Sequence, residues 1–216
     1  MANYLPLYVN MEKRPILIFG GGNKAAEIIE QLLPYGVDLN VAAEKVTPSI
    51  KAFGEEKKLR LIKSNGTDSQ KLISRIQPVF VVIADVDPVV IADIFKMCVK
   101  KGVDVHTVGK QDFSTFLFPY VIRRKNLSVA VSTFGGSPAA AKWIIEHIEK
   151  SLPAAIDNAL DHLQTIRQKI KSTATAASGQ FAAVYREILN AALRENRMLS
   201  AGEVAQIMTK HIEEAE

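Results

Sequence analysis

Cysteine is nearly absent from this 216-residue sequence, in which Cys98 stands alone. A single cysteine forms no internal disulfide, so nothing indicates a small secreted scaffold. Long apolar runs are lacking too, because three aspartates and Pro88 interrupt the most hydrophobic stretch, residues 78–95. The first residues show no basic and then apolar secretion signal. We therefore expect a cytoplasmic protein with no membrane association.

Aromatic residues are sparse at 7%, and the sequence has no helix-turn-helix pattern and no mixed basic and aromatic pattern. The net charge of +4 and the pI of about 9.1 favour anionic ligands, but they give no reason to expect nucleic-acid binding. Hydrophobic residues make up 48% of the chain, which is enough to bury a core. The length suits one large domain, or a nucleotide-binding domain with a smaller partner.

Three consecutive glycines give the strongest local signal. They follow a short apolar run at residues 16–19 and precede a helical pattern, and they fit G-x-G-x-x-A with Gly20, Gly22 and Ala25. In that motif Gly20 permits a tight turn, Gly22 lets the backbone approach a pyrophosphate, and Ala25 keeps the helix close to the sheet. The N–H groups that begin the helix then face the phosphates.

Glu44 directly follows a second predicted strand at residues 39–43. An acidic residue at this distance from Gly20 accepts hydrogen bonds from the ribose of a bound dinucleotide. The alternative is a solvated loop glutamate. Lys24 and Lys45 leave NADP open as the cofactor, but Glu44 would repel its 2′-phosphate, so we expect NAD.

Predicted strands and helices alternate five times up to residue 108, which indicates an α/β fold with a Rossmann-type parallel sheet. The carboxyl edge of that sheet would gather residues 20–24, Glu44, Asp85 and the residues after Val108. The strands are expected at residues 16–19, 39–43, 59–62, 79–84 and 103–108.

The pattern changes after this point. Two strands, residues 115–122 and 127–132, are expected to form a β-hairpin, and Ser137 is expected to cap a helix that begins at Pro138. An isolated hairpin is marginally stable, so we expect it to pair with its copy in a homodimer.

The sequence after Pro153 is helical in composition, with a connection at residues 172–179 and a capping box at Ser200 and Glu203. We therefore predict three parts: an NAD-binding Rossmann domain (1–113), a hairpin and helix dimerisation region (114–152) and a C-terminal helical domain (153–216).

Three separated segments, residues 5–8, 19–25 and 128–138, together with Pro119, resemble precorrin-2 dehydrogenases, the family that also forms the N-terminal module of siroheme synthases. The resemblance covers about residues 1–153. It implies NAD-dependent oxidation of precorrin-2 to sirohydrochlorin by a homodimer, and some members of the family also insert iron. By motif match it places cofactor contacts on Asn23, Lys24, Glu44 and Lys45.

The chain departs from this family at one position. Members often carry an aspartate after the fifth strand, which is the favoured general base for dehydrogenation and metal insertion, and Gly109 stands there in this sequence. Asp112 and His106 are the remaining catalytic candidates. The alternatives are a plain loop aspartate and a core histidine.

Precorrin-2 carries many carboxylates, so its pocket should hold cations. Arg123, Arg124 and Lys125 form the densest basic group and are the expected substrate-binding residues, with Ser137 at a helix N-terminus. The alternatives are a solvated turn for the cations and simple helix capping for Ser137. The scattered histidines predict no metal site. We expect weak or absent ferrochelatase activity, and a dinucleotide- or tetrapyrrole-binding sensor or carrier is the alternative function.

Overall fold

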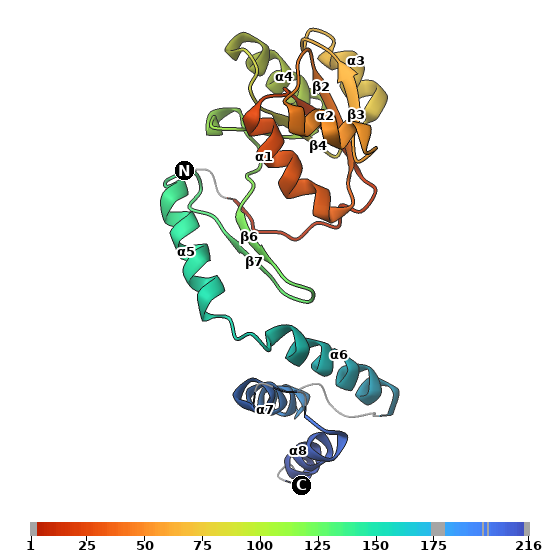
Figure 1. The fold of residues 1–216 in the computed structure, drawn as a ribbon, viewed down its shortest axis with the longest axis vertical. Helices are drawn as coiled ribbons and strands as arrows, with labels where there is room; N and C mark the ends of the chain where they lie inside the picture. Colours follow the sequence, from red (N-terminus) through yellow and green to blue (C-terminus); the bar gives the residue numbers. More distant parts are fainter. Residues whose placement is uncertain (1–3, 174–179, 196, 198, 214–216) are drawn as a thin grey trace. The chain divides into compact units, whose positions relative to one another are not determined.

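The computed structural model describes residues 4–173, 180–195, 197 and 199–213 (Figure 1). Contacts divide the chain into two units, one ending at Phe118 and the other beginning at Pro119. The first boundary therefore lies five residues later than the predicted one at 113. The further division at residue 152 stays a prediction.

The first unit is built on a five-stranded parallel sheet of order β3-β2-β1-β4-β5. The direction of strand succession reverses at β1, which is the kind of switch point where α/β sheets bind ligands. Phe19 at the end of β1 pairs with Ala42 of β2 and Ile83 of β4. The strands are β1 (Pro15–Phe19), β2 (Asp38–Ala43), β3 (Arg60–Lys63), β4 (Phe80–Ile83) and β5 (Asp104–Thr107).

Helices cover both faces of this sheet, because alternate residues of each strand point to opposite sides. Ile16 and Ile18 share one core cluster with α1 and α2, while Leu17 and Phe19 share the other with α3 and α4. The predicted Rossmann-type α/β fold is confirmed. The helices are α1 (Asn23–Leu32), α2 (Pro48–Glu55), α3 (Ser69–Ile76) and α4 (Pro88–Lys101), with short 3-10 turns η1 (Leu33–Tyr35) and η2 (Gln111–Phe113).

The predicted hairpin is confirmed, but its first strand begins only at Tyr120, so the prediction of a strand is wrong for residues 115–119. Thr115 hydrogen-bonds with β5, since its backbone N–H donates to the Val105 carbonyl at 2.7 Å and its Oγ1 accepts from the Val105 N–H at 2.9 Å. Phe116 packs on Phe80 of β4, with ring centroids 4.7 Å apart. These side chains fasten residues 115–118 to the first unit, so the new strand starts only after Pro119.

In the second unit a two-stranded antiparallel hairpin pairs β6 (Tyr120–Arg123) with β7 (Ser128–Val131). Helix α5 (Pro138–Ser151) packs against both strands, and α7 (Gln180–Glu195) packs against α6 (Ile156–Thr173) and α8 (Ala201–Glu213). Helix α6 continues to Thr173, so the predicted connection begins later than residue 172, and residues 174–179 lie outside the described chain. None of the helices described is long and apolar enough to cross a membrane.

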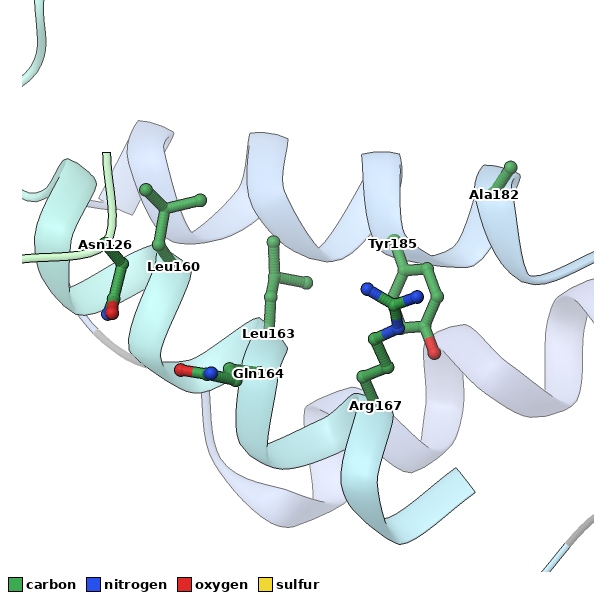
Figure 2. Close-up of a pocket in the computed structure, with 7 residues that line it drawn as sticks. All are labelled: Asn126, Leu160, Leu163, Gln164, Arg167, Ala182 and Tyr185. Carbon is green, nitrogen blue, oxygen red and sulfur yellow. The ribbon is translucent and has the colours of Figure 1, made fainter. Parts of the chain in front are cut away.

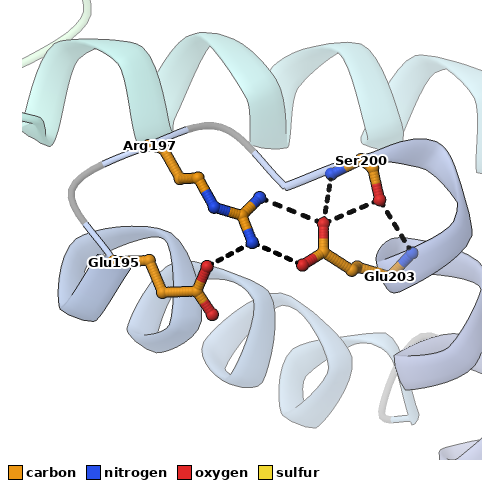
Figure 3. Close-up of polar contacts among 4 residues, drawn as sticks. All are labelled: Glu195, Arg197, Ser200 and Glu203. Atoms are coloured by element: carbon orange, nitrogen blue, oxygen red, sulfur yellow. Dashed lines mark hydrogen bonds and ion pairs between the residues drawn. The ribbon is translucent and has the colours of Figure 1, made fainter.

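The predicted capping box at the start of α8 is confirmed (Figure 3). The Ser200 N–H donates to Glu203 Oε2 at 2.7 Å, and the Glu203 N–H donates to Ser200 Oγ at 3.3 Å. Arg197 adds two hydrogen bonds to the same carboxylate, at 3.1 and 2.6 Å, and also pairs with Glu195. The hydrogen bonds from Arg197, followed by those from Ser200, lower the pKa of Glu203.

Candidate functional site

The glycine turn passes between the ends of two neighbouring strands. The Gly20 N–H donates to the Ala42 carbonyl of β2 at 3.0 Å. Gly20 has a φ of +111°, and a Cβ there would lie 1.5 Å from the carbonyl oxygen of Ala84, just beyond β4. Only glycine fits this conformation and this approach, so the turn is held at the switch point of the sheet.

The next two glycines bring the backbone close to other loops of the same edge. A Cβ on Gly21 would lie 2.3 Å from the Lys45 carbonyl oxygen, and the Gly21 carbonyl accepts from the Thr47 N–H at 2.9 Å. Gly22 is the extended N-cap residue of α1 and has no side chain to cover the helix N-terminus. The first N–H groups of α1 are therefore reachable by an anion.

Asp85 supplies such an anion from within the chain. Its Oδ2 accepts from the backbone N–H of Lys24 at 3.0 Å and from that of Ala25 at 3.4 Å. A Cβ on Gly22 would lie 2.4 Å from the same oxygen. The turn thus has the geometry of an anion site. From the sequence, Asp85 was expected at this edge without a role, although an acidic residue directly after a buried strand was the available signal.

The predicted cofactor residues lie around this turn. Asn23 and Lys24 form the first exposed turn of α1, and Glu44 and Lys45 follow the end of β2 with exposed side chains. The structure brings both pairs to the carboxyl edge of the sheet, together with Gly20 and Gly22. Their contacts with a cofactor stay a prediction.

His106 lies within β5, among aromatic rings. Its Nδ1 is 3.2 Å from the Phe116 carbonyl oxygen, and its ring centroid is 5.7 Å from that of Phe116 and 5.2 Å from that of Phe118. Burial lowers the pKa of His106, and the hydrogen bond with Phe116 offsets part of that shift. A neutral, packed imidazole favours the core alternative over catalysis.

Asp112 lies just beyond the carboxyl end of β5, on the short turn η2, with its side chain exposed. Its neighbour Phe113 holds the turn in place. The Phe113 ring packs edge-on against Phe95 with centroids 5.5 Å apart, and its carbonyl accepts from Thr107 Oγ1 at 2.6 Å. Gly109 has a φ of +75°, and a Cβ there would meet nothing within 4 Å. A side chain at position 109 would therefore enter open space, although the positive φ would strain any residue other than glycine.

In the second unit, ion pairs hold Arg124 and Lys125 of the expected substrate-binding cations. Arg124 lies 3.5 Å from Glu149 of α5, and Lys125 lies 2.7 Å from Asp161 of α6. The hydrogen bond from Lys125 lowers the pKa of Asp161. Both pairs fasten the hairpin turn to the helices of its own unit, while Arg123 at the end of β6 has an exposed side chain.

Ser137 caps α5, as expected: its Oγ accepts from the Ala140 N–H at 3.1 Å. The Thr133 side chain holds Ser137 in place, accepting from its N–H at 3.1 Å and donating to its carbonyl at 2.9 Å. These bonds explain Ser137 without a ligand. Substrate binding by Ser137 and by the basic turn stays a prediction.

A hollow of about 500 Å³ lies beside the hairpin turn in this second unit (Figure 2). Sequence analysis did not anticipate it. Its lining mixes apolar and polar side chains from the turn, α6 and α7, namely Asn126, Leu160, Leu163, Gln164, Arg167, Ala182 and Tyr185.

The central strand of this parallel sheet runs through a three-glycine turn into a helix, at the point where strand order reverses. This arrangement defines a Rossmann dinucleotide-binding domain. The family model described as "Putative NAD(P)-binding" matches residues 7–120, which is more than half of the chain. The chain therefore belongs to this NAD(P)-binding family.

Two curated relatives are siroheme synthases. Siroheme synthase 1 of Serratia proteamaculans is 29% identical over 175 residues, which are 81% of this chain and 36% of the relative. Siroheme synthase of Baumannia cicadellinicola is 32% identical over 171 residues, which are 78% of this chain and 36% of the relative. The chain thus spans about a third of the length of these relatives.

Among solved structures, the chain resembles "SirC, precorrin-2 dehydrogenase" with a TM-score of 0.69 and 21% identity, over 97% of this chain and 100% of that one. At this identity the likeness shows a shared fold.

Proposed function

We propose that this chain is an NAD-dependent dehydrogenase of the cytoplasm that oxidises precorrin-2 to sirohydrochlorin. The carrying observation is the glycine turn, whose helix N–H groups already hold a carboxylate at 3.0 and 3.4 Å. The chain's membership of the NAD(P)-binding family and its siroheme synthase relatives support the same reading. The SirC structure supports the proposal through its fold.

The chain's own residues have three tasks in this reaction. NAD, when bound, accepts the hydride that leaves the tetrapyrrole. The N–H groups of Lys24 and Ala25 would hold its pyrophosphate in place of the Asp85 carboxylate, and the Glu44 carboxylate would accept hydrogen bonds from the ribose hydroxyls. Asp112, exposed just beyond β5, receives the proton that the substrate loses.

The test is to incubate purified protein with precorrin-2 and either NAD or NADP. We expect the absorbance of sirohydrochlorin to appear with NAD and much more slowly with NADP. Glu44→Gln should raise the KM for NAD and narrow the preference for NAD over NADP, because the neutral amide no longer repels a 2′-phosphate. NAD binding without turnover would count against the dehydrogenase.

We further propose that the protein acts as a homodimer joined through the hairpin and α5. This region exposes a set of large apolar side chains: Tyr120, Val121, Phe134, Trp143 and Ile144. Exposed apolar groups of this kind mark contact surfaces. Light scattering at micromolar concentration should give a dimer for the wild type and a monomer for Val121→Glu. The control Lys96→Glu, on the exposed surface of α4 and outside the hairpin and α5, should also give a dimer. A monomeric wild type would refute the dimer.

A non-catalytic role as a dinucleotide or tetrapyrrole sensor or carrier is the second candidate. It is favoured by Gly109, where a glycine leaves empty space at the position of the family's base. Gly109→Asp discriminates between the two roles. A variant that gains turnover over an inactive wild type, with unchanged NAD affinity, would support the sensor or carrier reading.

A further inference from the structure

The phosphate-binding end of α1 is already occupied by part of the chain. Asp85 Oδ2 takes the hydrogen bonds of Lys24 N and Ala25 N, which are the groups that face a pyrophosphate in a Rossmann site. One set of N–H groups cannot serve two anions at once. We propose that Asp85 is an internal competitor that sets the affinity of this site, so that a phosphate ligand binds measurably only when it makes further contacts elsewhere, as a whole dinucleotide does. This inference rests on the proposed dinucleotide binding.

The backbone around Asp85 fixes the carboxylate at this place. The Ala84 N–H donates to the Phe19 carbonyl at 2.9 Å, so the residue before Asp85 is bound to the end of β1. Asp85 itself has a φ of +56°, in the left-handed region that aspartate tolerates better than most residues. This conformation follows directly from the end of β4 and turns the side chain toward α1.

Gly22 leaves the room that either anion needs. A Cβ on Gly22 would lie 2.4 Å from Asp85 Oδ2 and 2.7 Å from its carboxyl carbon. The space freed by the missing side chain therefore holds the Asp85 carboxylate. A pyrophosphate in the same space would meet the Asp85 negative charge at close range unless the side chain rotated away.

Selectivity follows from what each ligand gains after displacing Asp85. Any phosphate must replace the two hydrogen bonds that Asp85 already accepts, so its net gain there is small. Inorganic pyrophosphate has no further group to bind. A dinucleotide also reaches the ribose-binding carboxylate of Glu44, and those additional contacts make displacement favourable. The internal carboxylate therefore weakens every phosphate ligand by the same factor, which leaves small anions below measurable binding and a dinucleotide above it.

The experiment compares Asp85→Gly and Asp85→Asn with the wild type. Glycine adopts a positive φ freely and removes the competitor, whereas asparagine keeps a hydrogen-bond acceptor and removes only the charge. Asp93→Asn, on the exposed surface of α4, is the matched control for loss of one charge. Calorimetric titration with NAD and, separately, with inorganic pyrophosphate gives the dissociation constants.

We expect the Kd for NAD to fall about tenfold in Asp85→Gly and about threefold in Asp85→Asn, with no change in Asp93→Asn. Pyrophosphate should bind Asp85→Gly measurably and the wild type hardly at all. Without ligand, melting curves should show Asp85→Gly less stable than the wild type, and NAD should raise its Tm by more. If Asp85→Gly does not fold, Asp85→Asn carries the same comparison.

Unchanged or weaker NAD binding in both Asp85 variants would overturn the competitor role. Binding of neither NAD nor pyrophosphate to any of the proteins would overturn it together with the dinucleotide site. A wild type that binds NAD but does not turn over precorrin-2 would defeat only the proposed function, and the shift in Kd would still support Asp85 as the competitor.

Discussion

Gly20 lies so close to Ala84 that a Cβ on Gly20 would come within 1.5 Å of the Ala84 carbonyl oxygen. The β1–α1 turn and the end of β4 therefore depend on a position without a side chain. Gly20→Ala should abolish NAD binding and lower the free energy of unfolding by at least about 2 kcal/mol, because both the contact and the φ of +111° become strained. Calorimetric titration and denaturant unfolding measure the two effects.

Gly202→Ala is the control for that substitution, since it adds the same methyl group near the start of α8, where the nearest atom is 4.0 Å away. It should stabilise the protein by about 0.5 kcal/mol through helix propensity. Wild-type stability and NAD affinity in Gly20→Ala would contradict the role of the close approach.

Burial lowers the pKa of His106 in the folded protein. The unfolded chain therefore binds this proton more readily, so stability is full above about pH 6.5 and falls as the pH drops through the ordinary histidine range. One such group changes the free energy of unfolding by at most about 1.4 kcal/mol per pH unit. Urea unfolding at several values between about pH 5 and pH 8 measures this dependence of stability on pH.

His106→Phe keeps an aromatic ring among Phe116 and Phe118 and removes the titration, so it should flatten this pH dependence while turnover persists. Loss of turnover in His106→Phe with normal NAD binding would instead assign catalysis to His106.

Arg124 and Glu149 test whether the basic turn serves the substrate or the fold. If Arg124 binds precorrin-2, Arg124→Gln should raise the substrate KM several-fold, whereas Glu149→Gln should lower it or leave it unchanged, because it releases the guanidinium from its partner at 3.5 Å. Steady-state kinetics separates these outcomes. Unchanged KM in Arg124→Gln would leave the turn with a structural role only.

Iron insertion into sirohydrochlorin should be weak, because the family's aspartate is Gly109 here and Asp112 lies three positions later. A displacement of about 1 Å can cost on the order of a hundredfold in rate. Anaerobic incubation with sirohydrochlorin and Fe²⁺ should not exceed the rate without enzyme. Gly109→Asp should raise it, since a side chain there meets no atom within 4 Å and aspartate adopts the strained φ of +75° more readily than most residues. Insertion above background that disappears in Asp112→Ala would show that Asp112 has taken over this role.

Ser200 should stabilise the C-terminal helices through its cap. Ser200→Ala removes the acceptor for the Glu203 N–H and should cost about 1 kcal/mol, whereas Ser200→Asn should retain most of the stability. Thermal unfolding followed by circular dichroism measures the difference. Equal stability of all three proteins would mean that the hydrogen bonds of Arg197 to Glu203 suffice to hold the start of α8.

Local patterns in the sequence determined much of the first unit. The five parallel strands were predicted from apolar runs, and the turn at Gly20 and Gly22 from its glycine spacing, because strand burial and turn sterics depend on neighbouring residues. The box at Ser200 and Glu203 was equally predictable, since its partners lie within one helical turn. Such features can be predicted without knowing which strands lie side by side.

The tertiary structure alone decided which distant groups meet. Asp85 reaches the N–H of Lys24 only because β4 lies beside β1 in the sheet, and Thr115 leaves its predicted strand only because β5 offers it hydrogen bonds. Lys125 pairs with Asp161 only because the hairpin turn lies next to α6. The spacing of apolar residues shows which face of a helix or strand is buried. Strand order and packing decide which charged group or N–H group from elsewhere in the chain contacts that face.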